Sequence, residues 1–397
     1  MNEHTQKIKI RHLLPVMFGF FIMGFIDIIG IATNYIKSDL GDISDTMASL
    51  LSLSCFFWFL VLSIPAGGLL NRYGRKRTVL VSLFIHAVGL IIPFIHYSFG
   101  WVIVSFGLVG IGNTLLQVAL NPLVTNVVTK ERLTATLTLG QFVKAMSSLS
   151  GPVLAAWFAG TIYGWRLLFP VFAAVSLLEA LWLLFTRVPK EDRSHFKAIS
   201  VRSVAGLLKD PYIRVLFIGI LVLVGVDVGM NVSFPKYLMA DFQLPLEKAG
   251  MGNSIYFFSR TVGALIGGIL MMRLNERKFY IYSVLLALLG LLIMLMASSL
   301  ASQRLLVAFV GVVLFGLGYA NLFSIVFAFA LHHLPLKANE VSALLIIGVS
   351  GGAVLPPVIG LATDLTHAQM TGIILIAVVW MYMLYLNRFM ARHEQVS

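Results

Sequence analysis

Apolar residues gather in runs along this chain, and each run is long enough to cross a membrane. Short polar segments separate twelve such runs, which lie at residues 13–36, 46–70, 78–97, 101–128, 134–160, 167–187, 212–238, 248–272, 279–299, 303–330, 339–362 and 368–389. Roughly 20 consecutive apolar residues suffice for one helix to span the hydrocarbon core of a bilayer. The pattern therefore predicts an all-α integral membrane protein with twelve transmembrane helices.

One long polar segment, residues 188–211, divides the runs into two groups of six. Glycine motifs of the first group recur in the second about 200 residues later: Gly67-Gly68 with Gly267-Gly268, and Gly110-Ile111-Gly112 with Gly316-Leu317-Gly318. Transporters built from repeated halves hold their substrate between the two halves. We therefore predict a six-helix bundle at residues 1–187, a cytoplasmic linker at 188–211 and a second six-helix bundle at 212–397.

Two acidic residues stand alone in apolar runs, Asp27 in the first run and Asp227 in the seventh, 200 residues apart. At 1.5 Å per residue, Asp27 lies about 21 Å from the start of its run, close to mid-membrane. An ionisable side chain at this depth is costly and usually marks a transport path. Lys144 and Arg260 also lie within runs. Static ion pairing between helices is the alternative interpretation, and for Arg260 it is the favoured one.

The composition excludes several classes of protein. The chain is 59% hydrophobic and 12% charged, with a mean hydropathy of +0.92, whereas soluble domains carry about 25% charged residues. The single cysteine, Cys55, excludes an intrachain disulfide and a multi-cysteine metal cluster. We find no Walker-type loop and no nucleophile–base constellation. We therefore expect a protein that is not an enzyme and has no cofactor and no metal.

The basic residues predict the orientation in the membrane. With a cytoplasmic N-terminus, five of the 29 lysines and arginines fall on the outer side and two lie within runs, which leaves 22 on the inner side. The five are Lys37, Arg166, Lys236, Lys248 and Arg304. The positive-inside rule also accounts for the net charge of +12 without a nucleic-acid partner. We expect a multi-pass protein of the cell inner (plasma) membrane with both termini cytoplasmic. Ten or fourteen spans stay open as alternatives, but either number would spoil this alternation.

A glycine-rich basic loop follows the second run. It reads Gly67-Gly68-Leu69-Leu70-Asn71-Arg72-Tyr73-Gly74-Arg75-Lys76-Arg77. The loop resembles the signature of the major facilitator superfamily, Gly-x-x-x-Asp-Arg-x-Gly-Arg-Arg/Lys, with Asn71 where an aspartate is usual. This resemblance implies a gating role for Gly67, Asn71, Arg72, Gly74 and Arg75, and it implies the major facilitator fold. The alternative interpretation is a basic loop that only sets the topology.

Three further motifs are similar to the sugar-transporting branch typified by the L-fucose–proton symporter. They are Gly110-Ile111-Gly112-Asn113-Thr114-Leu115-Leu116-Gln117-Val118-Ala119-Leu120-Asn121-Pro122, Leu139-Gly140-Gln141-Phe142, and the run from Gly348 to Gly360 followed by Asp364. The resemblance implies that Asp27 couples transport to protons, and we expect Asp227 to assist it. Gln117 stands where that branch has a glutamate. An amide cannot exchange a proton, but it can still hydrogen-bond a hydroxyl group.

In this superfamily runs one, four, seven and ten line the cavity, which would place Asp27, Gln117, Asp227 and Asn321 around it. Sugars need many hydrogen-bonding partners, and the candidates for binding are Asn34, Gln117, Asn121, Gln141, Lys144 and Asn321. Lys144 beside Asp27 would form a coupling device if transport separated the two charges.

The expected function is import of a monosaccharide, a fucose-like or related hexose, by proton symport through alternating access. The bilayer and the sugar are the expected partners, and a monomer is expected because each chain would enclose its own cavity. Two other transport functions stay open: a sugar facilitator without proton coupling, and an exporter of small amphipathic compounds. A non-transporting sensor would need a sizeable output segment, and tails of about a dozen residues argue against one.

Overall fold

The computed structural model describes residues 10–394 except 42, 125–126, 128–129, 189–199, 272–275, 299, 301–303 and 335–336. The helices before residue 188 are α1 (Ile10–Met23), η1 (Gly24–Ile28), α2 (Ile29–Leu40), α3 (Asp45–Tyr73), α4 (Arg75–Ile95), α5 (Phe99–Val124), α6 (Lys130–Ala159), η2 (Trp165–Leu167) and α7 (Leu168–Phe185). We call this part of the chain the first half.

The second half contains the helices after residue 200. They are α8 (Val201–Gly206), η3 (Leu207–Lys209), α9 (Pro211–Phe242), α10 (Leu246–Met271), α11 (Glu276–Ala297), α12 (Arg304–Tyr319), α13 (Leu322–His333), α14 (Ala338–Ile347), η5 (Gly348–Ser350), α15 (Gly351–Thr366) and α16 (Met370–Glu394). Each of the twelve predicted apolar runs therefore contains a helix.

Within the described residues, ten helical segments are long and apolar enough to cross a membrane. Helices α6 and α10 are outside that set although they have 30 and 26 residues, and they hold Lys144 and Arg260. Three predicted runs are interrupted rather than continuous. The first changes to a 3-10 helix at η1, the tenth breaks between α12 and α13, and the eleventh changes at η5. Each break frees backbone groups for partners other than the helix itself.

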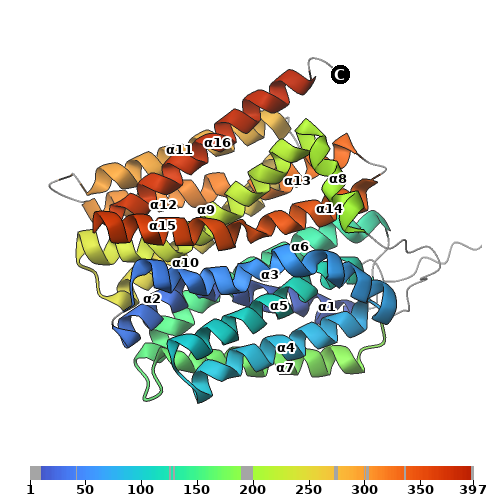
Figure 1. Ribbon diagram of the computed structural model, residues 1–397, viewed down its shortest axis with the longest axis horizontal. Helices are drawn as coiled ribbons and strands as arrows, with labels where there is room; N and C mark the ends of the chain where they lie inside the picture. The colour runs from blue at the N-terminus through green and yellow to red at the C-terminus, as the bar shows by residue number, and fades with distance from the viewer. Residues whose placement is uncertain are drawn as a thin grey trace, which may run out of the picture.

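Buried apolar side chains form two clusters. One cluster draws on residues 16–183 with only three buried members from the second half, and the other draws on residues 204–390. Figure 1 shows the same division, with the helices of the first half in the lower part of the view and those of the second half in the upper part. The molecule therefore has two cores, one for each half of the sequence.

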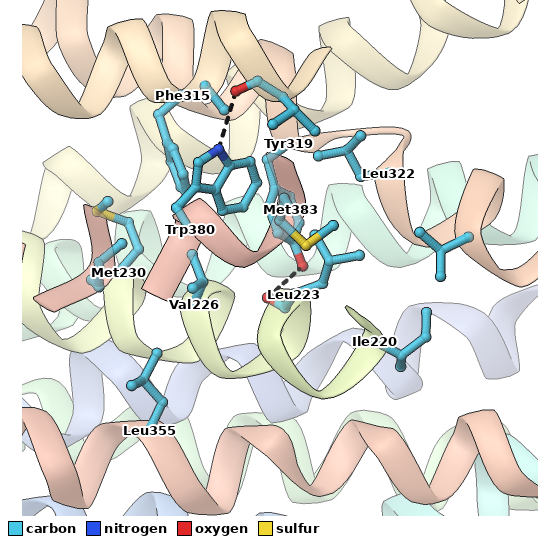
Figure 2. Close-up of a cluster of buried hydrophobic side chains, with 14 of the residues drawn as sticks. Ile220, Leu223, Val226, Met230, Phe315, Tyr319, Leu322, Leu355, Trp380 and Met383 are labelled. Carbon is cyan, nitrogen blue, oxygen red and sulfur yellow. Dashed lines mark hydrogen bonds between the residues drawn. The ribbon is translucent and has the colours of Figure 1, made fainter. Parts of the chain in front are cut away.

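Trp380 lies at the centre of the second core, against Phe315, Tyr319 and Met383 (Figure 2). Its indole N–H donates to the carbonyl of Val284 at 3.1 Å, and the hydroxyl of Tyr319 donates to the carbonyl of Leu223 at 3.2 Å. Both polar groups are therefore satisfied although their side chains are buried, as a stable apolar interior requires.

The glycine motifs that predicted a repeat have matching contacts in the two halves. An added Cβ at Gly112 would lie 2.9 Å from the carbonyl oxygen of Ser82, where α5 crosses α4. An added Cβ at Gly318 would lie 2.5 Å from the carbonyl oxygen of Ser283, where α12 crosses α11. Both glycines thus allow two helix backbones to approach closely, as small residues do in membrane proteins.

The two ends of the helices differ, and we name them after residues of α3. The Asp45 end is where α3 begins, and the Gly74 end is where α3 turns into α4. Gly74 has φ of 87°, which a glycine adopts without strain. Gly67 has no atom within 4 Å of an added Cβ, and the exposed Arg72 lies 5.3 Å from the Tyr73 ring.

The predicted gating loop thus lies at the Gly74 end. The side chain of Asn71 is outside the described residues. Arg75 begins α4, with Gly74 as the residue before the helix.

Candidate functional site

The 3-10 turn η1 carries Asp27 and is held at both ends by amide side chains. The Asn113 amide donates to the carbonyl of Met23, the residue before the turn, at 3.1 Å. The Asn231 amide donates to the carbonyl of Asp27 at 2.7 Å. Asn113 belongs to α5 of the first half and Asn231 to α9 of the second half. The interrupted helix is therefore stabilised by side chains that bind its backbone, as membrane helices with breaks require.

The carboxylate of Asp27 accepts a short hydrogen bond from the hydroxyl of Ser148 on α6. Helix α6 can approach because residue 24 is a glycine, whose added Cβ would lie 2.6 Å from the Lys144 carbonyl oxygen. Among the described residues, no lysine or arginine nitrogen lies within 4.0 Å of the Asp27 carboxylate, and Lys144 forms no ion pair with it. The backbone of Lys144 is thus adjacent to η1, while its ammonium group is not bonded to Asp27.

Asp227 has a different environment from Asp27. The guanidinium Nη1 of Arg260 on α10 lies 2.7 and 2.9 Å from its two carboxylate oxygens. The hydroxyl of Tyr256 donates to the same carboxylate at 2.7 Å. The guanidinium carbon also lies 4.9 Å from the centre of the Tyr319 ring. This pair joins α9 to α10, in agreement with the interpretation of Arg260 as a partner in an inter-helix ion pair.

The structure brings one predicted binding residue into the amide chain around η1. The Gln117 amide donates to the side-chain oxygen of Asn113 at 2.8 Å, so Gln117 is connected to the Asp27 turn through Asn113. Gln141, Lys144 and Ser148 occur on α6 at intervals of three and four residues, so they share one face of this helix. Gln141 is exposed and Lys144 is partly exposed. Of these three residues, Ser148 contacts the Asp27 carboxylate.

The side chains of two other predicted binding residues donate hydrogen bonds to backbone carbonyls of other helices. Asn34 is buried and donates to the carbonyl of Val232 in the other half at 3.3 Å. Asn321 is buried at the break between α12 and α13 and donates to the carbonyl of Gly263 at 2.8 Å. The side chain of Asn121 lies outside the described residues. Asn34 and Asn321 therefore tie helices together in this structure.

A polar network joins the two halves at the Asp45 end. The buried carboxylate of Asp45 accepts hydrogen bonds from Lys236 at 2.8 Å, Gln369 at 2.6 Å and Thr363 at 3.1 Å, all in the second half. Lys37 of the first half pairs with the same carboxylate. In return, the carboxylate of Asp364 accepts hydrogen bonds from the first two backbone N–H groups of α3. We call these six residues the Asp45 network.

The hydrogen bonds described between the two halves are confined to one part of the molecule. They join η1 and α2 to α9, or they belong to the Asp45 network. A small enclosed void lies beside the network and is lined by Ser49, Ser233 and Pro356. Asp45 lies near the end of the helices, so the hydrogen bonds between the halves extend from the turn at Asp27 to that end.

Several residues of the site were missed in the sequence. Ser148 lies four residues after Lys144, and Asn231 lies four residues after Asp227, so helical spacing could have indicated both. Asn253 on α10 carries no such signal, because its contact is with Asn231 on another helix. Asp45, Lys236 and Gln369 lie near the ends of apolar runs, where charged and polar residues are expected anyway.

The chemistry of the site is that of polar recognition. The described residues contain no group of three His, Cys, Asp or Glu side chains that could hold a metal ion. The amides and hydroxyls around η1 can hydrogen-bond a neutral polar molecule, and the Asp27 carboxylate can accept a proton. A groove of about 420 Å³ between α6, α10 and α12 is different, because apolar residues such as Leu149, Met251 and Phe258 line it. It contains none of the predicted site residues.

Comparison with known proteins places the chain among transporters. The sequence model of the Major Facilitator Superfamily matches residues 16–355. The chain is 25% identical over 360 residues to the glucose/galactose transporter of Brucella abortus (strain 9-941), an alignment that covers 87% of this chain and 86% of that protein.

Two solved structures share the fold. The E. coli fucose:proton symporter matches with a TM-score of 0.69 and 17% identity, over 96% of this chain and 99% of that one. The nucleoside transporter NupG matches with a TM-score of 0.77 and 13% identity, over 97% and 99% of the two chains. Structures of proteins with different substrates thus resemble this one.

Proposed function

We propose, from the premise that the chain belongs to the Major Facilitator Superfamily, that it imports a monosaccharide together with a proton by alternating access. Membership in this superfamily makes the protein a multi-pass membrane transporter and not an enzyme. The glucose/galactose transporter of Brucella abortus supports a hexose as substrate. The amide groups around η1 support the same substrate class, because a hexose presents hydroxyl groups that donate and accept hydrogen bonds.

One observation carries the proton-coupled part of the proposal. Asp27 is a partly buried carboxylate whose described side-chain partner is a hydroxyl group, that of Ser148, and not a cation. A carboxylate without a directly bonded lysine or arginine can bind a proton and lose its charge within a membrane protein. We therefore assign proton coupling to Asp27, and we assign Asp227 to an ion pair that holds α9 against α10.

The proposed architecture follows the two halves of the sequence. We propose twelve transmembrane helices in two six-helix bundles, at residues 1–187 and 212–397, with residues 188–211 as a cytoplasmic linker. The two apolar clusters and the matching glycine contacts support this division. The distribution of lysine and arginine supports both termini in the cytoplasm and the Asp45 end outside. A monomer in the cell inner membrane is part of the same proposal.

The Asp45 network supports an alternating-access cycle. With the Asp45 end outside, the network would close the outer entry, and opening this entry requires that Asp45 separate from Lys236, Thr363 and Gln369. Charged groups in a buried network interact strongly, so the loss of one partner should favour separation. We propose that the structure represents a state closed to the outside.

Accessibility of a cysteine beside the network would test this assignment of the closed state. Ser233 is buried beside Lys236, and Cys55 can be replaced by serine to leave one thiol. In the Cys55→Ser, Ser233→Cys protein, Lys236→Met should raise labelling by an impermeant maleimide from outside intact cells by about fivefold, a population shift of roughly 1 kcal/mol. Unchanged labelling would contradict the role of the network as an outer gate.

Uptake of radiolabelled sugars by proteoliposomes tests the proposed function itself. Glucose, galactose and fucose should each be offered with and without an inward proton gradient, and accumulation should require the gradient. Equilibration that does not depend on the gradient would favour the second candidate function, a facilitator without proton coupling. The Gln117 amide favours that alternative, because it cannot exchange a proton. Absence of uptake of every sugar would contradict both functions and favour an exporter.

A further inference from the structure

The turn that bears Asp27 is connected to the second half by two amide side chains in series. The Asn253 amide on α10 donates to the backbone carbonyl of Asn231 at 2.8 Å and to its side-chain oxygen at 2.6 Å. The Asn231 amide on α9 donates to the carbonyl of Asp27 at 2.7 Å. Both asparagines are buried, with side chains 5% and 0% exposed for Asn231 and Asn253. The two hydrogen bonds from Asn253 therefore fix the orientation of the Asn231 side chain that binds the Asp27 carbonyl.

The contact between Asn231 and the first half is unusually close. An added Cβ at Gly30 would lie 2.3 Å from the side-chain carbon of Asn231, so a residue larger than glycine would displace the amide. Gly30 belongs to α2, one turn beyond Asp27. The Asn231 amide is thus enclosed between a glycine of the first half and Asn253 of the second. Buried hydrogen bonds of this kind are strong because the surroundings have a low dielectric constant.

The two ends of the turn η1 are held in different ways. The bond from Asn113 to the carbonyl of Met23 lies within the first half, so a movement of one half against the other preserves it. The bond from Asn231 to the carbonyl of Asp27 crosses between the halves, so its length depends on the position of one half relative to the other. One end of the turn is therefore permanently held, while the other depends on the position of the second half.

We propose that Asn231 is a positioning residue for Asp27. Asn231 acts as a clamp on the turn η1 only while the Asp45 end is closed. In that state the clamp holds η1 so that the Asp27 carboxylate meets the Ser148 hydroxyl. When the halves separate, the Asp27 carbonyl loses its amide partner, and η1 and the carboxylate rearrange. The side of the membrane to which the protein is open thereby controls how Asp27 binds its proton. This inference rests on the proposed function, because it assigns Asn231 to the coupling of the same transport cycle.

Two assays on reconstituted protein separate positioning from other roles. Proton-driven accumulation of glucose measures coupling, and exchange of external for internal glucose at equal pH measures binding and movement of the halves. Asn231→Ala should reduce accumulation by about five- to tenfold, the factor expected for one buried hydrogen bond, while exchange and its KM stay within about twofold. Thr33→Val is the matched control, since it removes a buried hydrogen bond on α2 to the Ile29 carbonyl. The control should leave both assays unchanged.

A second variant distinguishes a loss of positioning from misfolding. Asn253→Ala keeps Asn231 but removes the donor that orients it, so accumulation should fall by about two- to threefold with exchange preserved. A parallel loss of accumulation and exchange in the Asn231→Ala and Asn253→Ala proteins would overturn the proposal and indicate a structural role. A raised KM in exchange would overturn it in favour of direct sugar contact, and unchanged accumulation would also overturn it. Failure of the proposed function is seen separately, as absence of transport in the wild-type protein.

Discussion

Asp27 and Asp227 occupy corresponding places in the two halves of this protein, yet their surroundings are opposite. Asp227 is neutralised by Arg260 through two contacts and receives a third hydrogen bond from Tyr256. Asp27 receives a hydroxyl hydrogen bond from Ser148, and its backbone, not its carboxylate, is bound by Asn231. The acid of the second half is thus part of an ion pair, whereas the acid of the first half has no bonded cation among the described residues.

The difference indicates how two acids at matching places in the two halves can have different local partners. A charge that is paired across two helices stabilises their packing and resists protonation, because its partner would be left unpaired. A carboxylate that is bonded to a hydroxyl and not directly to a cation can exchange a proton without breaking an ion pair. We therefore expect variants of Asp227 and Arg260 to affect folding, and variants around Asp27 to affect coupling. The following predictions begin with the largest expected effect.

Removal of Arg260 should have the largest effect, and it should act on stability. Arg260→Ala leaves the partly buried Asp227 carboxylate without its cation, and the loss of one partner of such a pair costs up to about 3 kcal/mol, the lower end of the range for fully buried pairs. We expect a strongly lowered Tm in detergent, measured by intrinsic tryptophan fluorescence, and little folded protein. The double variant Asp227→Asn, Arg260→Gln removes both charges and should recover most of the lost Tm. Equal Tm values for Arg260→Ala and the wild type would contradict the structural role of this pair.

Ser148→Ala should weaken coupling without a comparable loss of folding. The Ser148 hydroxyl is the described donor to the Asp27 carboxylate, and a hydrogen bond to a charged group contributes about 1.5–3 kcal/mol. We expect proton-driven accumulation to fall about tenfold while sugar exchange at equal pH continues. Ser150→Ala is the matched control on the same helix, because Ser150 donates to the Ser147 carbonyl and not to Asp27. Equal losses in the two variants would refute the special position of Ser148.

Gln117→Leu should affect sugar binding and leave coupling intact. The Gln117 amide belongs to the chain that leads through Asn113 to η1, and it can donate to and accept from a sugar hydroxyl. We expect the KM of exchange to rise about five- to tenfold, which corresponds to one lost polar contact. The accumulation ratio at saturating sugar should stay close to that of the wild type. A strongly lowered accumulation ratio with an unchanged KM of exchange would assign Gln117 to coupling instead of sugar binding.

Asn321→Ala should have the smallest effect, although the sequence predicted a binding role for this residue. Its amide is buried and bound to the Gly263 carbonyl, where it joins the break between α12 and α13 to α10. We expect a loss of about 1 kcal/mol of stability, the usual contribution of one hydrogen bond, seen as a slightly lowered Tm. The KM for sugar should change by less than about twofold. A large rise in KM with an unchanged Tm would restore Asn321 to the binding site.

Much of the fold could be predicted from the sequence, because apolar runs of membrane length and their repeat are local patterns. Within the described residues each of the twelve runs contains a helix, ten helical segments are long and apolar enough to cross a membrane, and the glycine pairs have matching contacts. The breaks at η1 and η5 were not predicted. For η1 the cause is tertiary, because Asn113 and Asn231 from other helices hold it and no residue within the run indicates those partners.

The site could be predicted in part, for a related physical reason. Asp27, Asp227 and Arg260 were recognised because single charges in apolar runs are conspicuous. The pairing of Arg260 with Asp227, and the absence of an ion pair between Lys144 and Asp27 within the described residues, depend on how the helices are rotated. Asn34 was predicted to face a sugar but binds the Val232 carbonyl, because a buried amide hydrogen-bonds whichever backbone group the packing brings near it.

Proton-driven accumulation of glucose by the Asp27→Asn protein tests the central claim most directly, because asparagine keeps the shape of aspartate but cannot bind a transported proton. It should be measured in proteoliposomes beside the wild type and the Asp227→Asn, Arg260→Gln protein, with exchange at equal pH as the control for folding. The account predicts that Asp27→Asn abolishes accumulation and retains exchange, while the double variant accumulates glucose. Gradient-driven accumulation by Asp27→Asn, or its loss only in the double variant, would contradict the assignment of coupling to Asp27.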